Sequence, residues 1–338
     1  MERWGATAFE FVTVPTDRRS RVLHPFAVPC MHGVLALNVS RGCAHACAYC
    51  YMRAYPETPP RGWLHVYDNL AARLEEELAR MRRPPRAVSL CTATDPFQPS
   101  SALLSSTYQA AELLLKKGVT ITFLTKGFIA DEFISLFSRF PHLVRARIGF
   151  LSLDPLYHQL FEPGTAPPTA RLANIQRLRE AGVPVGVRHD PVIPGVTDRP
   201  EGLEALFGVL AQEQVTQVDV GHLYLRPGIM RLLEGELPRE VARPLLRQFR
   251  GGPVARVAAS AATQLLPPEL RARSFSTIRR VAREQGITPI LCRCKNPDLA
   301  AERCQGAREL AFPRLRRQPT QLSLTLGPGP GVNPRTER

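Results

Sequence analysis

Long apolar runs are missing from this 338-residue chain. No uninterrupted apolar stretch approaches the roughly 20 residues needed to cross a membrane, and the first residues, from Met1 to Trp4, hold no apolar signal segment. These absences argue against a membrane-spanning class, and we expect a soluble, cytoplasmic protein. Its eight cysteines then lie in a reducing compartment, where clustered cysteines indicate a metal site or catalysis rather than disulfides.

Lysine is scarce as well. The chain has four lysines (Lys116, Lys117, Lys126 and Lys295), yet its 44 basic residues outnumber 30 acidic ones and give a formal charge of +14. Nearly all of this excess is arginine, and a basic surface favours phosphate backbones as partners. A genome that uses arginine in place of lysine gives the same composition, so charge alone leaves nucleic-acid binding open.

Short apolar runs alternate with amphipathic helical patterns along most of the chain. The predicted strands are residues 34–39, 87–91, 119–124, 143–151, 184–188 and 217–223. The predicted helices are residues 67–83, 101–117, 129–139, 168–181, 200–213, 238–249 and 267–285. This alternation predicts an α/β fold with a parallel sheet and right-handed crossovers.

Three cysteines, Cys43, Cys47 and Cys50, follow the first predicted strand at a C-x3-C-x2-C spacing. Cysteine thiolates hold iron–sulfur clusters, and a four-iron cluster normally takes four of them. Because this motif supplies three, the fourth iron is left open for chemistry. The alternatives are a zinc knuckle, although zinc sites favour two separated cysteine pairs, or three unrelated buried cysteines.

With the aromatic Tyr49 just before Cys50, this loop resembles that of the radical S-adenosylmethionine (SAM) superfamily. The resemblance implies that the amino and carboxylate groups of SAM occupy the open iron of a 4Fe-4S cluster, and that reductive cleavage gives a 5′-deoxyadenosyl radical. It also implies an electron donor such as flavodoxin or ferredoxin. The six strand–helix units match the partial (β/α)6 TIM barrel of that superfamily.

The expected organisation has four parts. They are an N-terminal lead-in (1–33), the partial barrel (34–235), a C-terminal helical extension with a second cysteine cluster (236–311) and a disordered, arginine- and proline-rich tail (312–338). An incomplete barrel leaves a lateral opening that suits a large substrate.

Motifs from about residue 34 to residue 198 resemble the spore photoproduct lyase branch, which repairs a methylene-bridged thymine dimer in DNA. They are Tyr49-Cys50-Tyr51, Cys91-Thr92 with Asp95, Thr125-Lys126, and Phe161-Glu162-Pro163-Gly164 followed by Arg171. The runs 94–99 and 192–198 are closer to the broader set of lyase-like radical SAM proteins. The resemblance therefore implies the SAM chemistry and leaves the identity of the substrate open.

Residue by residue, the resemblance implies that Cys91 donates a hydrogen atom to the product radical and that Tyr51 helps to return it. On the local sequence alone, the favoured interpretation of Cys91 is a small buried hydrophobic residue. The resemblance also implies that Lys126 contacts SAM, which suits a point-charge donor to the SAM carboxylate.

Four further residues are candidate SAM contacts. Tyr49 is expected near the adenine, with Thr92 beside the cofactor. Asp95 either accepts from the SAM ammonium group or caps the next helix. The serine expected after the fourth strand corresponds to Ser152 or, with a shift, to Gly149.

A second thiol group, Cys292, Cys294 and Cys304, lies near the C-terminus at a C-x-C-x9-C spacing. It predicts an auxiliary iron–sulfur cluster or a structural zinc, with unligated thiols as the alternative. Arg188 and Asp190, after the fifth strand, either line the pocket or form a structural ion pair.

The sequence therefore predicts a radical SAM enzyme, similar to spore photoproduct lyase and acting on DNA or other nucleic acid. One alternative is a radical SAM enzyme that modifies RNA or protein with an auxiliary cluster. The other is a non-catalytic iron–sulfur protein that binds nucleic acid.

Overall fold

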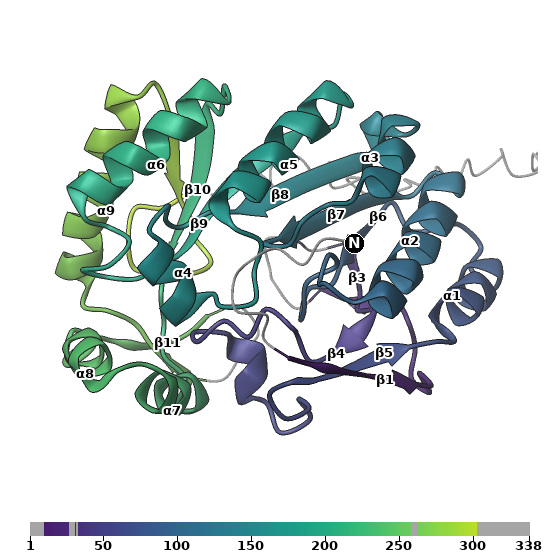
Figure 1. Ribbon diagram of the computed structural model, residues 1–338, viewed down its shortest axis with the longest axis horizontal. Coiled ribbons are helices and arrows are strands. Elements are labelled where there is room, and N and C mark those ends of the chain that lie inside the picture. The colour runs from purple at the N-terminus through teal and green to yellow at the C-terminus, as the bar shows by residue number, and fades with distance from the viewer. Residues whose placement is uncertain (1–9, 27–30, 32, 258–261, 303–338) are drawn as a thin grey trace, which may run out of the picture.

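The computed structural model describes residues 10–26, 31, 33–257 and 262–302, and its centre is an open eight-stranded sheet (Figure 1). The strand order is β13-β10-β9-β8-β7-β6-β3-β2, and each neighbouring pair is parallel except β2 with β3. The six predicted strands form β3 (Leu35–Leu37), β6 (Ala87–Leu90), β7 (Thr120–Thr125), β8 (Val144–Gly149), β9 (Val185–Val192) and β10 (Gln217–His222). The predicted partial barrel is confirmed, because the sheet does not close.

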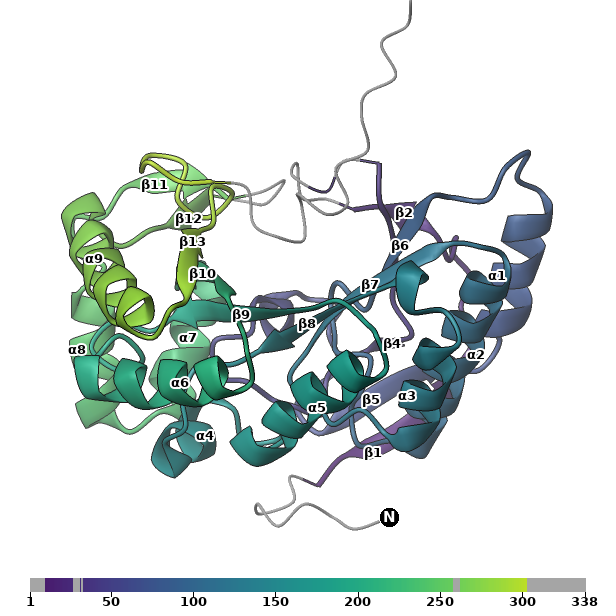
Figure 2. The same ribbon diagram turned by 90° about the horizontal axis from the view of Figure 1, so that it is seen from above.

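Helices cover the outer face of the curved sheet (Figure 2). The seven predicted helices form α1 (Leu70–Ala79), α2 (Ser101–Lys116), α3 (Asp131–Ser138), α5 (Pro168–Glu180), α6 (Pro200–Gln212), α8 (Arg239–Arg247) and α9 (Pro268–Glu284). The sequence analysis did not predict α4 (Pro155–Phe161), α7 (Pro227–Glu236), or the 3-10 helices η2 (Tyr51–Ala54) and η3 (Pro141–Leu143).

Local sequence fixes the ends of α2. The Ser100 hydroxyl oxygen accepts from the backbone N–H of Leu103 at 3.4 Å, which satisfies one of the first unpaired amides of the helix. Gly118, with φ +72°, adopts the left-handed conformation that ends it. Between these ends, a face that includes Leu114 is fully buried against the sheet and its neighbours.

Four phenylalanines tie the sheet to the loop that follows β6. Phe97, from that loop, packs edge-on against Phe123 of β7 and Phe133 of α3, with ring centroids 5.1 and 5.0 Å apart. Phe137 stacks on Phe123 at 5.6 Å. Burying such a side chain contributes about 1.5–3 kcal/mol, so this cluster anchors the residues between Cys91 and Phe97.

The segment expected to be an irregular lead-in contributes two strands. β1 (Val12–Thr16) pairs with β5 (Trp63–Tyr67), which also pairs with β4 (Ser40–Arg41), and β2 (His24–Pro25) joins the edge of the main sheet at β3. β1 and β2 are short and each contains a proline, so their sequences lack the alternation that marks a strand.

The C-terminal extension is not purely helical. β11 (Val254–Arg256) and β12 (Ala262–Gln264) form an antiparallel pair, and β13 (Thr288–Leu291) lies parallel to β10 at the other edge of the main sheet. The boundaries at 33, 235 and 311 stay predictions, and the tail 312–338 lies outside the described residues. In the part of the chain that the structure describes, no helix has the length and apolar character to cross a membrane.

Candidate functional site

The cysteine loop leaves the sheet after β4 and ends at η2. Gly42, just before the first cysteine, has φ +84°, and a Cβ there would lie 2.4 Å from the carbonyl oxygen of Trp63, so this tight turn needs glycine. Cys43, Cys47 and Cys50 line one cavity of about 270 Å³, and none of the three is in a disulfide. The structure therefore brings the predicted cluster ligands together.

A four-iron cluster fits this donor set. The thiolates that hold such a cluster surround it instead of meeting at one point, because they bind different iron atoms. Among the described residues, no group of three or more His, Cys, Asp or Glu side chains is placed to hold a metal ion. Three thiols spread around one cavity match the way in which cysteines hold a cluster.

One side of the cysteine loop is held by the segment after β6. The backbone N–H of Ala44 donates to Gln98 Oε1 at 2.7 Å, and Gln98 Nε2 donates to the Asp95 carbonyl oxygen at 2.8 Å. His45 Nδ1 lies 3.4 Å from Asp95 Oδ2. Gln98 is fully buried and was not among the predicted site residues.

The other side of the loop is held by the turn between α4 and α5. The backbone N–H of Ala48 donates to the Phe161 carbonyl oxygen at 3.0 Å, and that of Gly164 donates to His45 O at 3.1 Å. A Cβ on Gly164 would lie 2.1 Å from the Ala44 carbonyl oxygen, so the two backbones are in direct contact. The motif around Phe161 therefore supports the cysteine loop.

Glu162, in the same turn, is a buried anion surrounded by donors. Its carboxylate accepts from the hydroxyl groups of Tyr49 and Tyr157 and from Arg171 Nη2 at 2.6 Å, and it lies 3.8 Å from Lys126 Nζ. Burial acts to raise the pKa of Glu162, but Arg171, Lys126 and His158 outweigh it and lower the pKa to about 2. Sequence reasoning used the motif for resemblance and gave Glu162 no role.

Cys91 ends β6 in an unusual conformation. Its φ is +53°, a left-handed value that is uncommon for a residue other than glycine and is often found at functional sites. The residue is buried, as the hydrophobic interpretation expects, and it also lines the same cavity as the three cysteines, while its role as a hydrogen donor stays a prediction. Burial raises the pKa of the thiol to about 12, so it stays protonated at neutral pH.

Tyr51 is hydrogen-bonded to Thr92, the residue that follows Cys91. The Tyr51 hydroxyl group donates to the Thr92 carbonyl oxygen at 2.9 Å, and all three residues line the same cavity. The structure thus places the two predicted hydrogen-returning residues around one space. Their roles, and the SAM contact at Thr92, stay predictions.

Asp95 joins the end of β6 to the end of β7. Its Oδ1 accepts from the backbone N–H of Phe97 at 2.9 Å and from the Thr125 hydroxyl group at 2.7 Å, and its Oδ2 accepts from the N–H of Lys126 at 2.8 Å. The cap of α2 is Ser100, so the helix-cap alternative for Asp95 is wrong. Asp95 lines the cavity, and its contact with SAM stays a prediction.

Lys126 and Tyr49 lie side by side in the wall of the cavity. The Lys126 ammonium group lies 5.3 Å from the Tyr49 ring centroid, and both residues line the cavity. Ser152 is not among the lining residues; its hydroxyl oxygen accepts from the backbone N–H of Asp154 at 3.0 Å, at the start of α4. A SAM contact at Ser152 stays a prediction without geometric support.

A charged pair also lines the cavity, on the side of β13. Asp190 accepts hydrogen bonds from both Arg188 and Lys295, and the Lys295 ammonium group lies 5.1 Å from the Tyr224 ring centroid. Asp190 and Lys295 line the cavity, so the ion-pair and pocket interpretations of Asp190 both hold. Arg188 forms the ion pair but is not among the lining residues. Lys295 was not predicted, although a rare lysine inside a cysteine run is a visible signal.

Two of the three C-terminal cysteines, Cys292 and Cys294, lie within the described residues. Cys292 directly follows β13 and is buried, and its backbone N–H donates to the Val220 carbonyl oxygen at 2.8 Å. Cys304 lies outside the described residues, and Cys292 and Cys294 are in no ligand group there. An auxiliary cluster or zinc stays a prediction.

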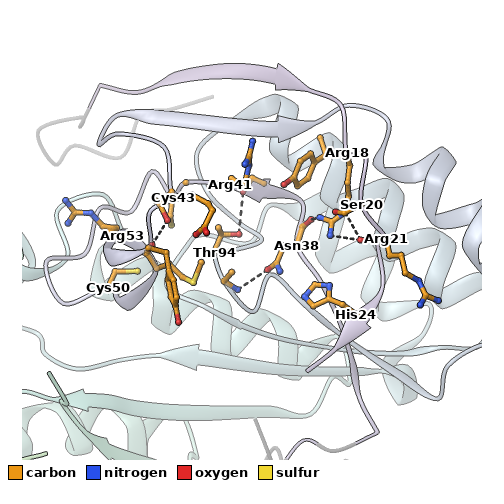
Figure 3. A pocket seen from close by; sticks show the side chains of 18 residues that line it. Arg18, Ser20, Arg21, His24, Asn38, Arg41, Cys43, Cys50, Arg53 and Thr94 are labelled. Atoms are coloured by element: carbon orange, nitrogen blue, oxygen red, sulfur yellow. Dashed lines mark hydrogen bonds between the residues drawn. The ribbon is translucent and has the colours of Figure 1, made fainter. Parts of the chain in front are cut away.

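A second, larger cavity adjoins the cysteine loop (Figure 3). Its volume is about 630 Å³, and it shares Cys43, Cys50, Ala93 and Thr94 with the first cavity. Its walls are rich in arginine. We call the first space the barrel cavity and this one the arginine cavity.

These features define a barrel protein that presents a cysteine-lined cavity at the carboxyl ends of parallel strands, where such barrels place their chemistry. The model of the radical SAM superfamily matches residues 37–206, half of the chain, and the protein belongs to that superfamily. The matched segment includes the cysteine loop, Cys91, Lys126 and Glu162.

Two curated relatives cover part of the chain. An uncharacterised protein of Mycobacterium tuberculosis is 34% identical over 200 residues, which are 56% of this chain and 58% of that protein. A radical SAM Nα-GlyT isomerase of Pseudomonas phage M6 is 27% identical over 190 residues, 55% of this chain and 38% of the isomerase. The chain thus matches less than two thirds of these relatives' length.

Solved structures share the fold over more of the chain. A variant of spore photoproduct lyase superposes with a TM-score of 0.65 at 19% identity, covering 83% of this chain and 82% of the lyase. Spore photoproduct lyase complexed with dinucleoside spore photoproduct gives a TM-score of 0.63 at 18% identity, with coverages of 83% and 82%. At these identities the likeness concerns the fold.

Proposed function

We propose that the protein is a radical SAM enzyme that holds a 4Fe-4S cluster on Cys43, Cys47 and Cys50 and acts on nucleic acid. The observation that carries this proposal is the shared cavity, which the three thiols, Cys91 and Lys126 all line. When bound, the cluster and SAM supply a 5′-deoxyadenosyl radical, as superfamily membership implies.

The chain's own residues have distinct tasks around that chemistry. Lys126 presents a positive charge for the SAM carboxylate, and Glu162 fixes Tyr49 next to it. Cys91 keeps its S–H hydrogen because burial raises the pKa of the thiol to about 12. That hydrogen atom passes to the carbon radical of the product, and the Tyr51 hydroxyl group, which is hydrogen-bonded to the Thr92 carbonyl oxygen, returns a hydrogen atom to the sulfur. One electron from the electron donor and one proton from water then restore the Tyr51 hydroxyl group.

The proposal is tested by anaerobic reconstitution with iron and sulfide, followed by SAM and a strong reductant. We expect release of 5′-deoxyadenosine, which is lost in a variant with Cys43, Cys47 and Cys50 all changed to alanine. A fully loaded wild-type cluster that releases none would refute the enzymatic proposal. The proposal includes an electron donor such as flavodoxin or ferredoxin.

Nucleic acid is the favoured substrate for two reasons. The chain carries a formal charge of +14, and positive groups lie near both edges of the open sheet, with Lys295 after β13 and Arg21, just before β2, in the arginine cavity. The fold is also that of a lyase solved with a dinucleoside photoproduct. A cytoplasmic location is part of the same proposal.

The first alternative, modification of RNA or protein with an auxiliary cluster, rests on Cys292, Cys294 and Cys304. Iron content separates the two, since one cluster gives about four irons per chain and two give about eight. The second alternative, a non-catalytic nucleic-acid-binding protein, requires salt-sensitive DNA binding without SAM turnover.

A further inference from the structure

The arginine cavity is built from five segments of the chain. They are the residues before and in β2, residues 38–43 that lead into the cysteine loop, residues 50–58, Tyr67 at the end of β5, and the turn at residues 93–94. Figure 3 shows the labelled arginines arranged around it, with Cys43 and Cys50 at one end. At about 630 Å³ it falls in the range of small-molecule sites, roughly 300–1,000 Å³.

One arginine of this cavity is buried without a carboxylate partner among the described residues. Arg18 is 8% exposed, and its guanidinium donates to the carbonyl oxygens of Arg21 at 2.7 and 3.0 Å and of Asn38 at 3.2 Å. It also lies 5.0 Å from the Tyr67 ring centroid. The nearby Glu77 carboxylate instead accepts two backbone N–H groups, so the charge of Arg18 is held by neutral acceptors.

The other lining groups leave a positive excess. Arg21 and Arg41 are exposed and make no ion pair with another described residue, whereas Arg53 is neutralised by Glu236. Glu57 is the one carboxylate among the lining residues. Arg18, Arg21 and Arg41 therefore outnumber Glu57, and this positive excess favours an anionic ligand.

We infer that the arginine cavity binds a phosphate ester next to the reaction site. Arginine matches phosphate geometry with two parallel donors. Because the two cavities share Cys43, Cys50, Ala93 and Thr94, a phosphate here lies beside whatever reacts in the barrel cavity. This inference rests on the proposed function and deepens it: the phosphate is the backbone of a strand whose reacting nucleotide enters the barrel cavity. A free nucleotide carries the same chemistry.

The test uses the reconstituted protein and a fluorescent single-stranded oligodeoxynucleotide, with binding measured by anisotropy over a range of KCl concentrations. The variant Arg21→Ala/Arg41→Ala removes two exposed charges and leaves buried Arg18 in place. The matched control is Arg273→Ala/Arg283→Ala on α9, two exposed arginines on the far side of the molecule (Figure 1).

We expect the cavity variant to bind the oligonucleotide more weakly than the wild type. The slope of log K against log salt should also become shallower by about 1.4, because two phosphate contacts are lost at about 0.7 each. The control keeps the wild-type slope, and Arg21→Lys/Arg41→Lys restores most of it. Wild-type affinity and slope in the alanine variant would overturn the inference, as would an equal loss in the control.

Competition with thymidine monophosphate distinguishes the two possible sources of the phosphate, a nucleic-acid strand and a free nucleotide. Displacement of the oligonucleotide, lost in the cavity variant, assigns the cavity to a free phosphate ester; failure to displace it assigns the cavity to a strand. SAM cleavage by the wild type is measured in parallel. The absence of SAM cleavage would refute the proposed function. The binding series would still show whether the arginine cavity binds a phosphate ester.

Discussion

Replacing Glu162 by glutamine removes a single buried charge and keeps the side-chain volume. In the native protein this carboxylate accepts from Tyr157 at 3.0 Å and from Arg171 at 2.6 Å. The Arg171 side chain is itself fully buried, with 0% of its surface exposed. Glutamine can offer one oxygen to these donors but turns an N–H group toward the others. The buried guanidinium loses its counter-charge, which costs about 3–5 kcal/mol.

The pKa of Glu162 gives a second value for the contribution of this carboxylate to the free energy of unfolding. A carboxyl group whose pKa falls from 4.5 to about 2 on folding contributes stability above pH 4.5 and loses it as the pH falls toward 2. At about 1.4 kcal/mol for each pH unit, this is about 3 kcal/mol. The two arguments agree, and together they predict a stability deficit in Glu162→Gln that is constant near neutral pH and shrinks in acid.

Urea unfolding of the reduced, cluster-free protein, followed by far-UV circular dichroism at pH 7 and pH 3, measures this deficit. Glu284→Gln is the matched control, because Glu284 is exposed and pairs with Arg280 at 2.9 Å on the surface of α9, an interaction worth about 0.5 kcal/mol or less. The reasoning fails if both variants are equally stable at pH 7, or if the Glu162 deficit is the same at both pH values.

Three further outcomes are expected. Cys91→Ala should still cleave SAM but lower the yield of the wild-type product by about tenfold or more, and chromatography showing unchanged products would remove Cys91 from the reaction. Gly164→Ala should displace Ala44 and reduce the iron retained on reconstitution, whereas Gly208→Ala, with open space around its Cβ, should retain it; equal iron in both would refute the backbone contact. Lys295→Met should reduce substrate-stimulated SAM cleavage and Lys295→Arg should restore it, and a Met variant with wild-type stimulation would leave Lys295 a structural role.

Periodicity predicted the barrel because its strands and helices repeat a strong local pattern. The runs that became β3, β6 and β7 are apolar and bounded by turns, and burial on both faces of a parallel sheet demands such runs. β13, by contrast, has four residues including Pro289 and forms only because β10 provides an edge for it. Strands whose stability comes from a partner leave little trace in their own sequence.

The cysteine triplet was visible because its ligands are close in sequence. Gln98 and Glu162 were not assigned, because their role depends on contacts across 54 and 113 residues, with Ala44 and Tyr49 respectively. Asp95 shows the converse error. Its position before α2 suggested a cap, but Ser100 lies nearer the helix start and takes that task, leaving Asp95 to join two strand ends.

The central claim is that the three-cysteine loop leaves an iron atom open to SAM. Electron paramagnetic resonance of the reduced, reconstituted protein, recorded with and without SAM, tests it most directly. The account predicts a four-iron signal that changes when SAM is added and is absent from the Cys43/Cys47/Cys50 alanine variant. A fully assembled four-iron cluster whose spectrum is the same with and without SAM would contradict it.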